Sequence, residues 1–309
     1  MRIAVYGTGG AGGYFGAQLA RAGHETILIA RGEHLNAIKN DGLRLETSTG
    51  ETVITPALAT DDPAQAGHVD VVLLGVKAWQ VAEAAERMKP LIGPNTVVAP
   101  LQNGVEAPSQ LSAVLGREHV LGGLCGTFSW IIAPGRIRSI GRMNYIKFGE
   151  LDNTASERTD RLCQAFEDAG VDVEVPRDIH KALWDKFLLT ASFGGMGAIT
   201  RAPIGVIRSM PGTLRILQEC MDEIFRLSRA CSVVLANTAV SDTMKLVHAM
   251  PEDATTSLQR DIMDGRPSEL EAWNGAVVRL AQEHGVPVPL HDFIYNCLLP
   301  QEQRARGSA

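Results

Sequence analysis

A glycine-rich turn near the start of the sequence has the residue types and spacing of a phosphate-binding site. The motif G-x-G-x-x-G runs from Gly7 to Gly12, after the apolar run Ile3–Tyr6 and at the start of the helix-like run Ala11–Ala22. The first glycine permits a tight turn, the second lets a pyrophosphate approach the backbone, and the third lets helix and strand pack closely. Free N–H groups at the helix N-terminus would then hold the phosphates. We therefore expect a dinucleotide here rather than an empty turn, contacted by Gly7, Thr8, Gly9, Gly10, Ala11 and Gly12.

The residue that ends the second apolar run, Thr26–Ala30, indicates which dinucleotide binds. An NAD site carries an acidic side chain about 20 residues beyond the glycines, where it meets the ribose 2′-OH. This sequence has Arg31 there, and Glu33 falls later, in the opening of the next helix. A guanidinium can bind phosphate oxygens in bidentate fashion. The pattern favours NADP(H) over NAD(H).

A second candidate for chemistry is Lys186, in the apolar segment 179–193. Helical spacing puts Ile179, Leu183, Lys186 and Thr190 on one stripe, so we predict a core-facing position for the lysine. A buried ammonium is costly unless it is paired, and burial favours the neutral amine, which suits a proton donor near neutrality. A snorkelling lysine or a structural ion pair is the alternative.

The elements that must position these residues fall into two halves. Strand-like and helix-like runs alternate up to about residue 119, which predicts an α/β fold with a mainly parallel sheet. Shorter strands follow, with turns expected at Pro134-Gly135 and Ser139–Gly141, and beyond Pro176 almost everything reads as helix. We expect an N-terminal Rossmann-like dinucleotide-binding domain, residues 1–176, and an all-helical C-terminal substrate and catalytic domain, residues 177–309. The end of the chain, from Gln301, reads as a solvated tail.

Two loops and one later segment add candidates. Ligands in open α/β sheets bind beyond the carboxyl ends of the strands, so Lys77 and Asn103 are expected at the cofactor edge. A solvated helix start and a helix N-cap are their structural alternatives. Further on, Ser268 and Glu271 are spaced as a capping box, which would put Glu269 in the first turn of a helix. Ser257 alone reads as a hydroxyl on a helix surface.

Composition narrows the class of protein. The net charge of −6 argues against a nucleic-acid partner, and no run of about 18 apolar residues predicts a membrane span. The five cysteines show neither a C-x-x-C pair nor zinc spacing, so no metal site is expected. The first residues enter a strand directly, without the apolar region of a signal peptide. We expect a cytoplasmic protein with a small-molecule substrate, for which a homodimer is possible.

Four motifs together resemble the ketopantoate reductase (2-dehydropantoate 2-reductase) family. They are Val76-Lys77-Ala78-Trp79-Gln80, Leu101-Gln102-Asn103-Gly104, Leu183-Trp184-x-Lys186 and Ser257-x-x-x-Asp261-Ile262-x-x-Gly265-Arg266-Pro267-x-Glu269. They occur in the family's order with similar gaps, over nearly the whole chain. The resemblance implies a Rossmann domain followed by a helical domain, with the active site in the cleft between them. It also implies NADPH-dependent reduction of 2-dehydropantoate to pantoate, in pantothenate biosynthesis.

The resemblance also implies roles for particular residues. Lys186 would donate a proton to the substrate carbonyl oxygen as hydride arrives. Glu269 would lie near the nicotinamide ribose and the lysine, as a catalytic and cofactor-binding residue. Asn103 and Lys77 would contact the cofactor and the active site, Asn103 with a catalytic part. Ser257 would bind the substrate carboxylate.

Three positions depart from the family pattern. Thr190, Gly194 and Ile204 stand where ketopantoate-specific members look to carry asparagines. Thr190 and Gly194 lie one and two helical turns beyond Lys186, so both are expected to line the substrate pocket. Lost amide hydrogen bonds can change discrimination between substrates by orders of magnitude. The leading interpretation is 2-dehydropantoate reduction, and a related NADPH-dependent reductase of a different 2-oxo acid is the alternative. A non-catalytic NADPH-binding sensor or a β-hydroxyacid dehydrogenase fits the motifs less well.

Overall fold

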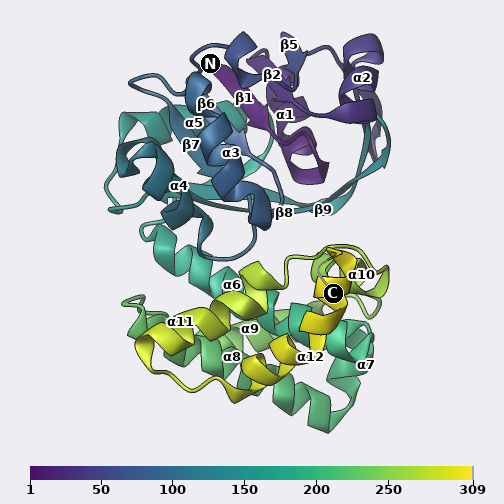
Figure 1. Ribbon diagram of the computed structural model, residues 1–309, viewed down its shortest axis with the longest axis vertical. Helices are drawn as coiled ribbons and strands as arrows, with labels where there is room; N and C mark the ends of the chain where they lie inside the picture. The colour runs from purple at the N-terminus through teal and green to yellow at the C-terminus, as the bar shows by residue number, and fades with distance from the viewer. Residues whose placement is uncertain (308–309) are drawn as a thin grey trace. The chain divides into compact units, whose positions relative to one another are not determined.

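The structure is a computed structural model that describes residues 1–307, apart from the side chains of residues 142 and 143. It contains two compact units (Figure 1). The first consists of Met1–Gln102 with Ala107–Ile179, and the second of Asn103–Glu106 with the chain from His180 on. The main division therefore falls between Ile179 and His180. The short segment Asn103–Glu106 belongs with the second unit, which no sequence pattern indicated.

A five-stranded parallel sheet forms the centre of the first unit. Its order is β5-β2-β1-β6-β7, with β1 at Arg2–Tyr6, β2 at Glu25–Ile29, β5 at Leu58–Thr60, β6 at Val71–Leu74 and β7 at Val97–Pro100. The helices of this unit are α1 (Gly10–Arg21), α2 (Gly32–Asp41), α3 (Val81–Arg87), α4 (Ala107–Leu115) and α5 (Glu157–Asp168). Because the strands are parallel, their carboxyl ends share one edge of the sheet. The predicted Rossmann-like α/β fold is confirmed.

A second sheet packs on the other side of α1. The hairpin of β3 (Leu43–Thr47) and β4 (Gly50–Ile54) joins β9 (Arg136–Glu150), which pairs with β8 (Leu121–Ala133) and β10 (Asp172–Glu174). The turn at Pro134-Gly135 is confirmed. The predicted turn at Ser139–Gly141 is wrong, because these residues lie inside β9 where its register with β8 shifts. Gly141 there has φ 83°.

The burial pattern explains why the parallel sheet needs cover on both faces. Along β1, Ile3 and Val5 belong to one core cluster, while Ala4 and Tyr6 belong to another. The first cluster also contains Phe15 of α1 and residues of the second sheet. Strands buried on both faces are typical of parallel sheets with covering layers. Helix α1, which follows the glycine turn, is thus held between the two sheets.

The second unit is helical, as predicted. Its helices are α6 (Ile179–Thr200, the first residue belonging to the first unit), α7 (Ile204–Ser209), α8 (Pro211–Ala230), α9 (Ala239–Ala249), α10 (Ser257–Met263), α11 (Ala276–His284) and α12 (Pro289–Ala305). A π-helical turn, Glu271–Gly275, precedes α11. The predicted solvated tail is wrong up to Ala305, because α12 continues to that residue and buries Glu302. Residues 308 and 309 lie outside the described part.

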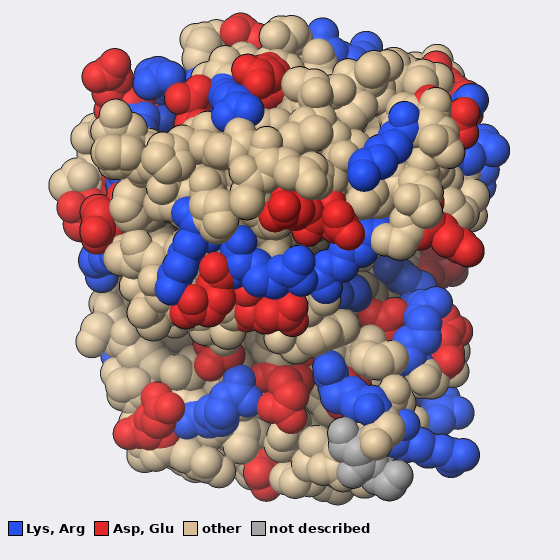
Figure 2. Space-filling view, turned by 45° about the horizontal axis from the view of Figure 1, so that its top comes forward, with Lys and Arg blue, Asp and Glu red and all other residues tan. Residues whose placement is uncertain are grey.

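The surface carries charges of both signs. On the face shown in Figure 2, lysine and arginine side chains alternate with aspartate and glutamate side chains. Over the described residues, no helix is long and apolar enough to span a bilayer.

Candidate active site

The three motif glycines of the turn have distinct surroundings. Gly7 has φ 95°, and a Cβ added to it would lie 2.7 Å from the Val76 nitrogen. A Cβ at Gly12 would lie 2.2 Å from the Gly7 oxygen, so only glycine allows this packing of helix on turn. A Cβ at Gly9 would meet nothing within 4 Å. The turn is therefore closed at Gly7 and Gly12 and open at Gly9, which fits the approach of a pyrophosphate to the first N–H groups of α1.

Hydrogen bonds anchor this turn to the end of β2. The backbone nitrogens of Gly7 and Thr8 and the Thr8 hydroxyl all donate to the Ile29 oxygen, at 3.1, 3.2 and 3.1 Å. Thr8 is buried, so its side chain stabilises the turn. A Cβ at Gly10 would lie 2.1 Å from the Ser129 oxygen of β8, so Gly10 lets the second sheet approach. These contacts give Thr8 and Gly10 structural roles beside the predicted cofactor contacts.

His34, in the first turn of α2, is a positioning residue that the sequence did not single out. Its Nδ1 accepts a hydrogen bond from the Gly135 nitrogen at 2.9 Å, which leaves Nε2 to donate to the Thr8 oxygen at 2.8 Å. The imidazole therefore joins the glycine turn to the β8–β9 connection. Burial lowers the pKa of His34, although its bond to Thr8 acts in the opposite direction. A single histidine in the first turn of a helix carries no sequence signal for this role.

Arg31 and Lys77 follow strands on either side of β1. Arg31 is the residue before α2, and its Nη2 lies 3.5 Å from Glu83 Oε1 of α3. Lys77 begins a short 3₁₀ turn, Ala78–Gln80, after β6, and its Nζ lies 5.8 Å from the centre of the Trp79 ring. Both residues belong to the unit that contains the glycine turn.

Gln102 holds the loop before Lys77 in place. Its side-chain amide donates to the Leu74 oxygen at 2.9 Å and to the Val76 oxygen at 2.8 Å. Gln102 is buried. It belongs to the Gln-Asn-Gly motif, but no role was predicted for it, because its partners are backbone carbonyls that no sequence pattern reveals.

In the second unit, the structure brings Asn103 and Lys186 together. Lys186 Nζ donates to Asn103 Oδ1 at 2.7 Å, although the two residues are 83 positions apart. Gly104, with φ 106°, lets this loop pack against the Ala272 oxygen, 3.0 Å from an added Cβ. The expected core-facing stripe is confirmed at Ile179 and Leu183, which are buried, but not at Lys186 and Thr190, which are half-buried. The helix is apolar on nearly every side, so periodicity did not separate these positions.

Glu269 is buried, at 7% exposure. The residue before it, Ser268, is hydrogen-bonded to helix α12. The Glu302 carboxylate accepts hydrogen bonds from the Ser268 nitrogen and hydroxyl. Arg306 donates to the Ser268 oxygen at 2.8 Å and to Glu302 at 2.6 Å. The predicted capping box is wrong, because Ser268 bonds to Glu302 and Glu271 instead pairs with Arg279 at 2.9 Å.

Two of the three positions that depart from the family pattern, Gly194 and Ile204, are packed by apolar neighbours. Gly194 is buried, and a Cβ added to it would lie 2.6 Å from two atoms of the Trp273 ring. The indole thus fills the space an asparagine side chain at 194 would need, so Gly194 presents no such surface to a substrate. Ile204 is fully buried in the helical core. Ser257 is the first residue of α10 and is half-buried.

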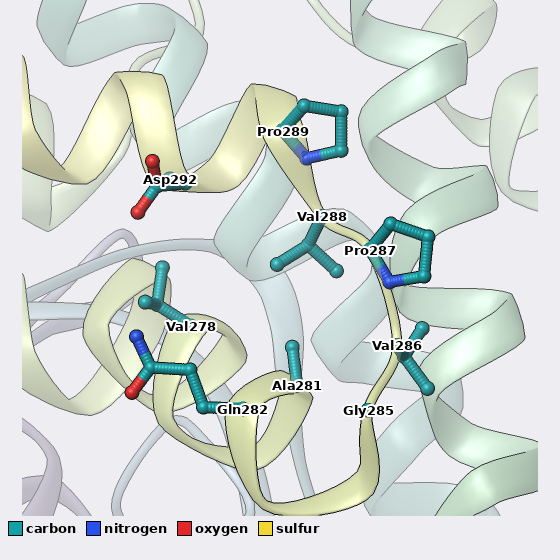
Figure 3. A pocket seen from close by; sticks show the side chains of 9 residues that line it. All are labelled: Val278, Ala281, Gln282, Gly285, Val286, Pro287, Val288, Pro289 and Asp292. Carbon is teal, nitrogen blue, oxygen red and sulfur yellow. The ribbon is translucent and has the colours of Figure 1, made fainter.

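A separate hollow lies elsewhere in the helical unit (Figure 3). It has a volume of about 560 Å³ and is bordered by α11, the connection Gly285–Val288 and the start of α12. Most side chains around it are apolar, with Gln282 and Asp292 as polar members. None of the predicted site residues lines it. This hollow is therefore distinct from the candidate active site.

Comparison with known proteins decides the family. The family model described as ketopantoate reductase PanE/ApbA matches residues 3–153, and its C-terminal counterpart matches residues 178–302. A solved PanE/ApbA family ketopantoate reductase from Ralstonia eutropha JMP134 is 31% identical, covers 99% of this chain and 100% of its own, and has a TM-score of 0.90. The chain belongs to the ketopantoate reductase family. It is thus an oxidoreductase of a family that acts on a CH–OH group and binds a nicotinamide dinucleotide.

Curated relatives of the ketopantoate reductase family match along almost their whole length. A 2-dehydropantoate 2-reductase of Mesorhizobium japonicum is 30% identical over 95% of both chains. An uncharacterized oxidoreductase of Bacillus subtilis is 27% identical over 96% of this chain and 97% of its own. The resemblance seen in the four motifs is confirmed at the level of the family.

Proposed function

We propose that this protein catalyses the NADPH-dependent reduction of 2-dehydropantoate to pantoate, a step of pantothenate biosynthesis. The observation that carries the proposal is the 2.7 Å hydrogen bond from Lys186 Nζ to Asn103 Oδ1. This bond orients the half-buried ammonium of Lys186 through the neutral amide of Asn103. The amide cannot take the proton from the ammonium. Relatives named 2-dehydropantoate 2-reductase, at 25–30% identity, support the choice of substrate.

The chemistry assigns one task to each residue. The nicotinamide cofactor, when bound in its reduced form, would supply the hydride that the substrate carbonyl carbon accepts. Lys186 stabilises the negative charge that develops on the carbonyl oxygen and transfers a proton from Nζ to it. Asn103 orients the ammonium, and Glu269 is assigned to the nicotinamide ribose and the lysine. Ser257 and Thr190 are assigned to the substrate.

NADPH is the proposed form of the cofactor. The open side of the turn at Gly9 suits the pyrophosphate, and Arg31 at the end of β2 suits a 2′-phosphate. The backbone of Gly7–Gly12 and the side chain of Lys77 complete the proposed cofactor contacts. We also propose that the protein acts in the cytoplasm on a small molecule, without a nucleic-acid or membrane partner. A homodimer remains a proposal that its mass in solution would test.

A second substrate is favoured by one specific observation. The Trp273 ring covers Gly194, and Ile204 is buried in the core, so neither position offers an amide to a polar substrate group. A site without these hydrogen bonds would discriminate less in favour of a substrate hydroxyl. We therefore keep a 2-oxo acid with a less polar side chain as the second candidate.

The test combines a substrate panel with one substitution. NADPH oxidation is followed with 2-dehydropantoate and with 2-oxo acids of graded side-chain polarity, which separates the two candidates by kcat/KM. Lys186→Ala should lower kcat by about 10²- to 10⁴-fold, because a general acid is lost. The dissociation constant for NADPH should change less than about twofold. This is well below a tenfold change, which corresponds to about 1.4 kcal/mol.

The matched control is Lys181→Ala. Lys181 lies on the same helix, where its Nζ forms an exposed ion pair with Asp185 Oδ2 at 2.7 Å. Its removal should leave kcat unchanged. Turnover retained in Lys186→Ala, or lost equally in both variants, would contradict the assigned role of Lys186.

A further inference from the structure

Arg31, the residue assigned to the 2′-phosphate, lies next to a carboxylate. Its Nη2 is 3.5 Å from Glu83 Oε1, and the two side chains are 54% and 59% exposed. The same Glu83 oxygen lies 3.6 Å from Arg87 Nη1, one turn further along α3. One carboxylate is therefore shared between two guanidinium groups.

The position of this ion pair in the sheet is informative. Arg31 follows β2 and α3 follows β6, while β1, which ends in the glycine turn, lies between these two strands. The pair thus joins the elements on both sides of the strand that leads into the phosphate-binding turn. In dinucleotide sites of this type, the adenosine ribose lies beyond the end of the second strand. The Glu83 carboxylate is therefore directed to the same guanidinium that a 2′-phosphate there would need.

The charges determine what this contact does. A phosphate monoester carries about −1.5 to −2 charges at neutral pH, so it attracts Arg31 and repels a carboxylate beside it. The ion pair is exposed on both sides, and such pairs are weak. A 2′-phosphate can therefore displace Glu83 from Arg31, and Glu83 then retains Arg87 as its counter-ion. NADH lacks this phosphate, so its binding does not require the Arg31–Glu83 ion pair to break.

We propose that Glu83 is a specificity-determining residue, which competes with the 2′-phosphate of NADPH for Arg31 and so limits the preference for NADPH over NADH. This inference rests on the proposed cofactor role of Arg31. Glu83 would weaken the binding of NADPH, which carries the 2′-phosphate, and leave the binding of NADH unaffected.

The test is a gain of affinity, which a misfolded variant cannot imitate. Dissociation constants for NADPH and NADH are measured by the fluorescence of the reduced nicotinamide, in the full-length protein. Glu83→Gln should tighten NADPH binding about three- to tenfold, the effect of removing one screened charge, and change NADH binding less than about twofold. The gain should shrink in about 0.5 M salt, because charges more than a few ångströms apart are then screened from one another. Unchanged or weaker NADPH binding in Glu83→Gln would overturn the proposal.

Two further variants complete the design. Glu86→Gln is the matched control, because Glu86 lies on the same helix and pairs with Lys89 instead of Arg31. It should leave both constants unchanged, and an equal gain there would overturn the assignment to Glu83. In an Arg31→Ala background, Glu83→Gln should no longer tighten NADPH binding, because no guanidinium is left to release. A gain that persists there would overturn competition for Arg31.

Arg31→Ala alone separates this inference from the function it rests on. A selective loss of NADPH binding supports the 2′-phosphate assignment, and Glu83 is then judged by its own variant. An equal loss for NADPH and NADH overturns that assignment and, with it, the role of Glu83. Reduction of a 2-oxo acid through Lys186 is tested separately and would stand in either case.

Discussion

At the scale of single residues, Gly194 shows how a departure from a family pattern acquires a physical reason. The sequence indicates only that an amide is missing at this position. The structure shows that the missing side chain makes room for Trp273, which is buried at 2% exposure. The two residues form a steric pair, so a side chain cannot be added at position 194 without moving the indole.

We expect Gly194→Asn to destabilise the protein by about 1–3 kcal/mol or more, because its Cβ would enter the Trp273 ring and a well-packed core does not absorb extra atoms. Thermal unfolding measures this loss. Thr190→Asn is the comparison, since Thr190 is half-buried one turn earlier on the same helix and should change stability less. If Trp273 is the cause, Trp273→Ala and Gly194→Asn combined should cost less than the sum of the two single changes. Full additivity, or a Gly194→Asn variant as stable as the parent, would contradict the steric pair.

Some residues could be predicted because their chemistry is local. Gly7, Gly12 and Arg31 were found from spacing within one strand–turn–helix unit, and the structure places them as that unit requires. Lys186 was also singled out from the sequence, but its half-buried position was not predicted. Asn103 was expected at the cofactor edge from its place after a strand, but its bond to Lys186 was not, because a contact across 83 positions leaves no periodic signal.

At the scale of elements, the region after residue 119 forms longer strands than expected. The strand β8 runs through 13 residues although it contains Gly123 and Gly126, a residue type that usually indicates turns. A Cβ at Gly123 would lie 2.4 Å from the Pro100 oxygen, and one at Gly126 would lie 2.3 Å from the Tyr145 ring. These glycines permit close packing inside a long strand. A sequence alone does not distinguish a glycine needed for packing from one needed for a turn.

His34 joins three elements, and its titration should affect their stability. Burial lowers its pKa below the ordinary 6.5, so the folded protein favours the neutral imidazole that accepts from Gly135. The unfolded chain then binds more protons as pH falls below 6.5, so the contribution of His34 is full above that value and is lost as pH falls through the folded pKa. We expect His34→Gln, which can still donate and accept, to lose less stability than the parent between pH 7 and pH 5.

Urea unfolding at the two pH values measures this difference. His248→Gln serves as the control, because His248 is exposed at the end of α9 and its replacement should change stability by less than about 0.5 kcal/mol. A pH dependence in His34→Gln equal to that of the parent would show that this imidazole does not link stability to protonation.

At the scale of the whole molecule, the chain passes between its two units more than once. It leaves the first unit after Gln102, returns at Ala107 and leaves again after Ile179. The short segment Asn103–Glu106 contains Asn103, the partner of Lys186. An ion pair of 2.9 Å between Glu106 and Arg279 anchors this segment in the second unit. A boundary read from composition divides a chain once, so this exchange could not be predicted from the pattern of elements.

The end of the chain provides the last test of how distant parts support the site. Glu302 lies 34 positions after Ser268, yet its buried carboxylate accepts from the Ser268 nitrogen and hydroxyl beside Glu269. Glu302→Ala would leave these donors and Arg306 without their acceptor, so we expect a loss of about 3–5 kcal/mol in the free energy of unfolding. Gln303→Ala, at the exposed neighbour on the same helix, should change it by less than about 0.5 kcal/mol.

Glu302→Gln separates support of Glu269 from stability alone. Glutamine keeps the shape and one acceptor, so the variant should remain folded with a smaller loss of about 1–2 kcal/mol. If the contact positions Glu269, kcat should fall in this variant at a temperature where it is fully folded, while Gln303→Ala keeps the parent's kcat. If residues from Gln301 on behaved as a solvated tail, Glu302→Ala would be as stable and as active as Gln303→Ala. Parallel measurements of unfolding and turnover on the three variants decide between the two.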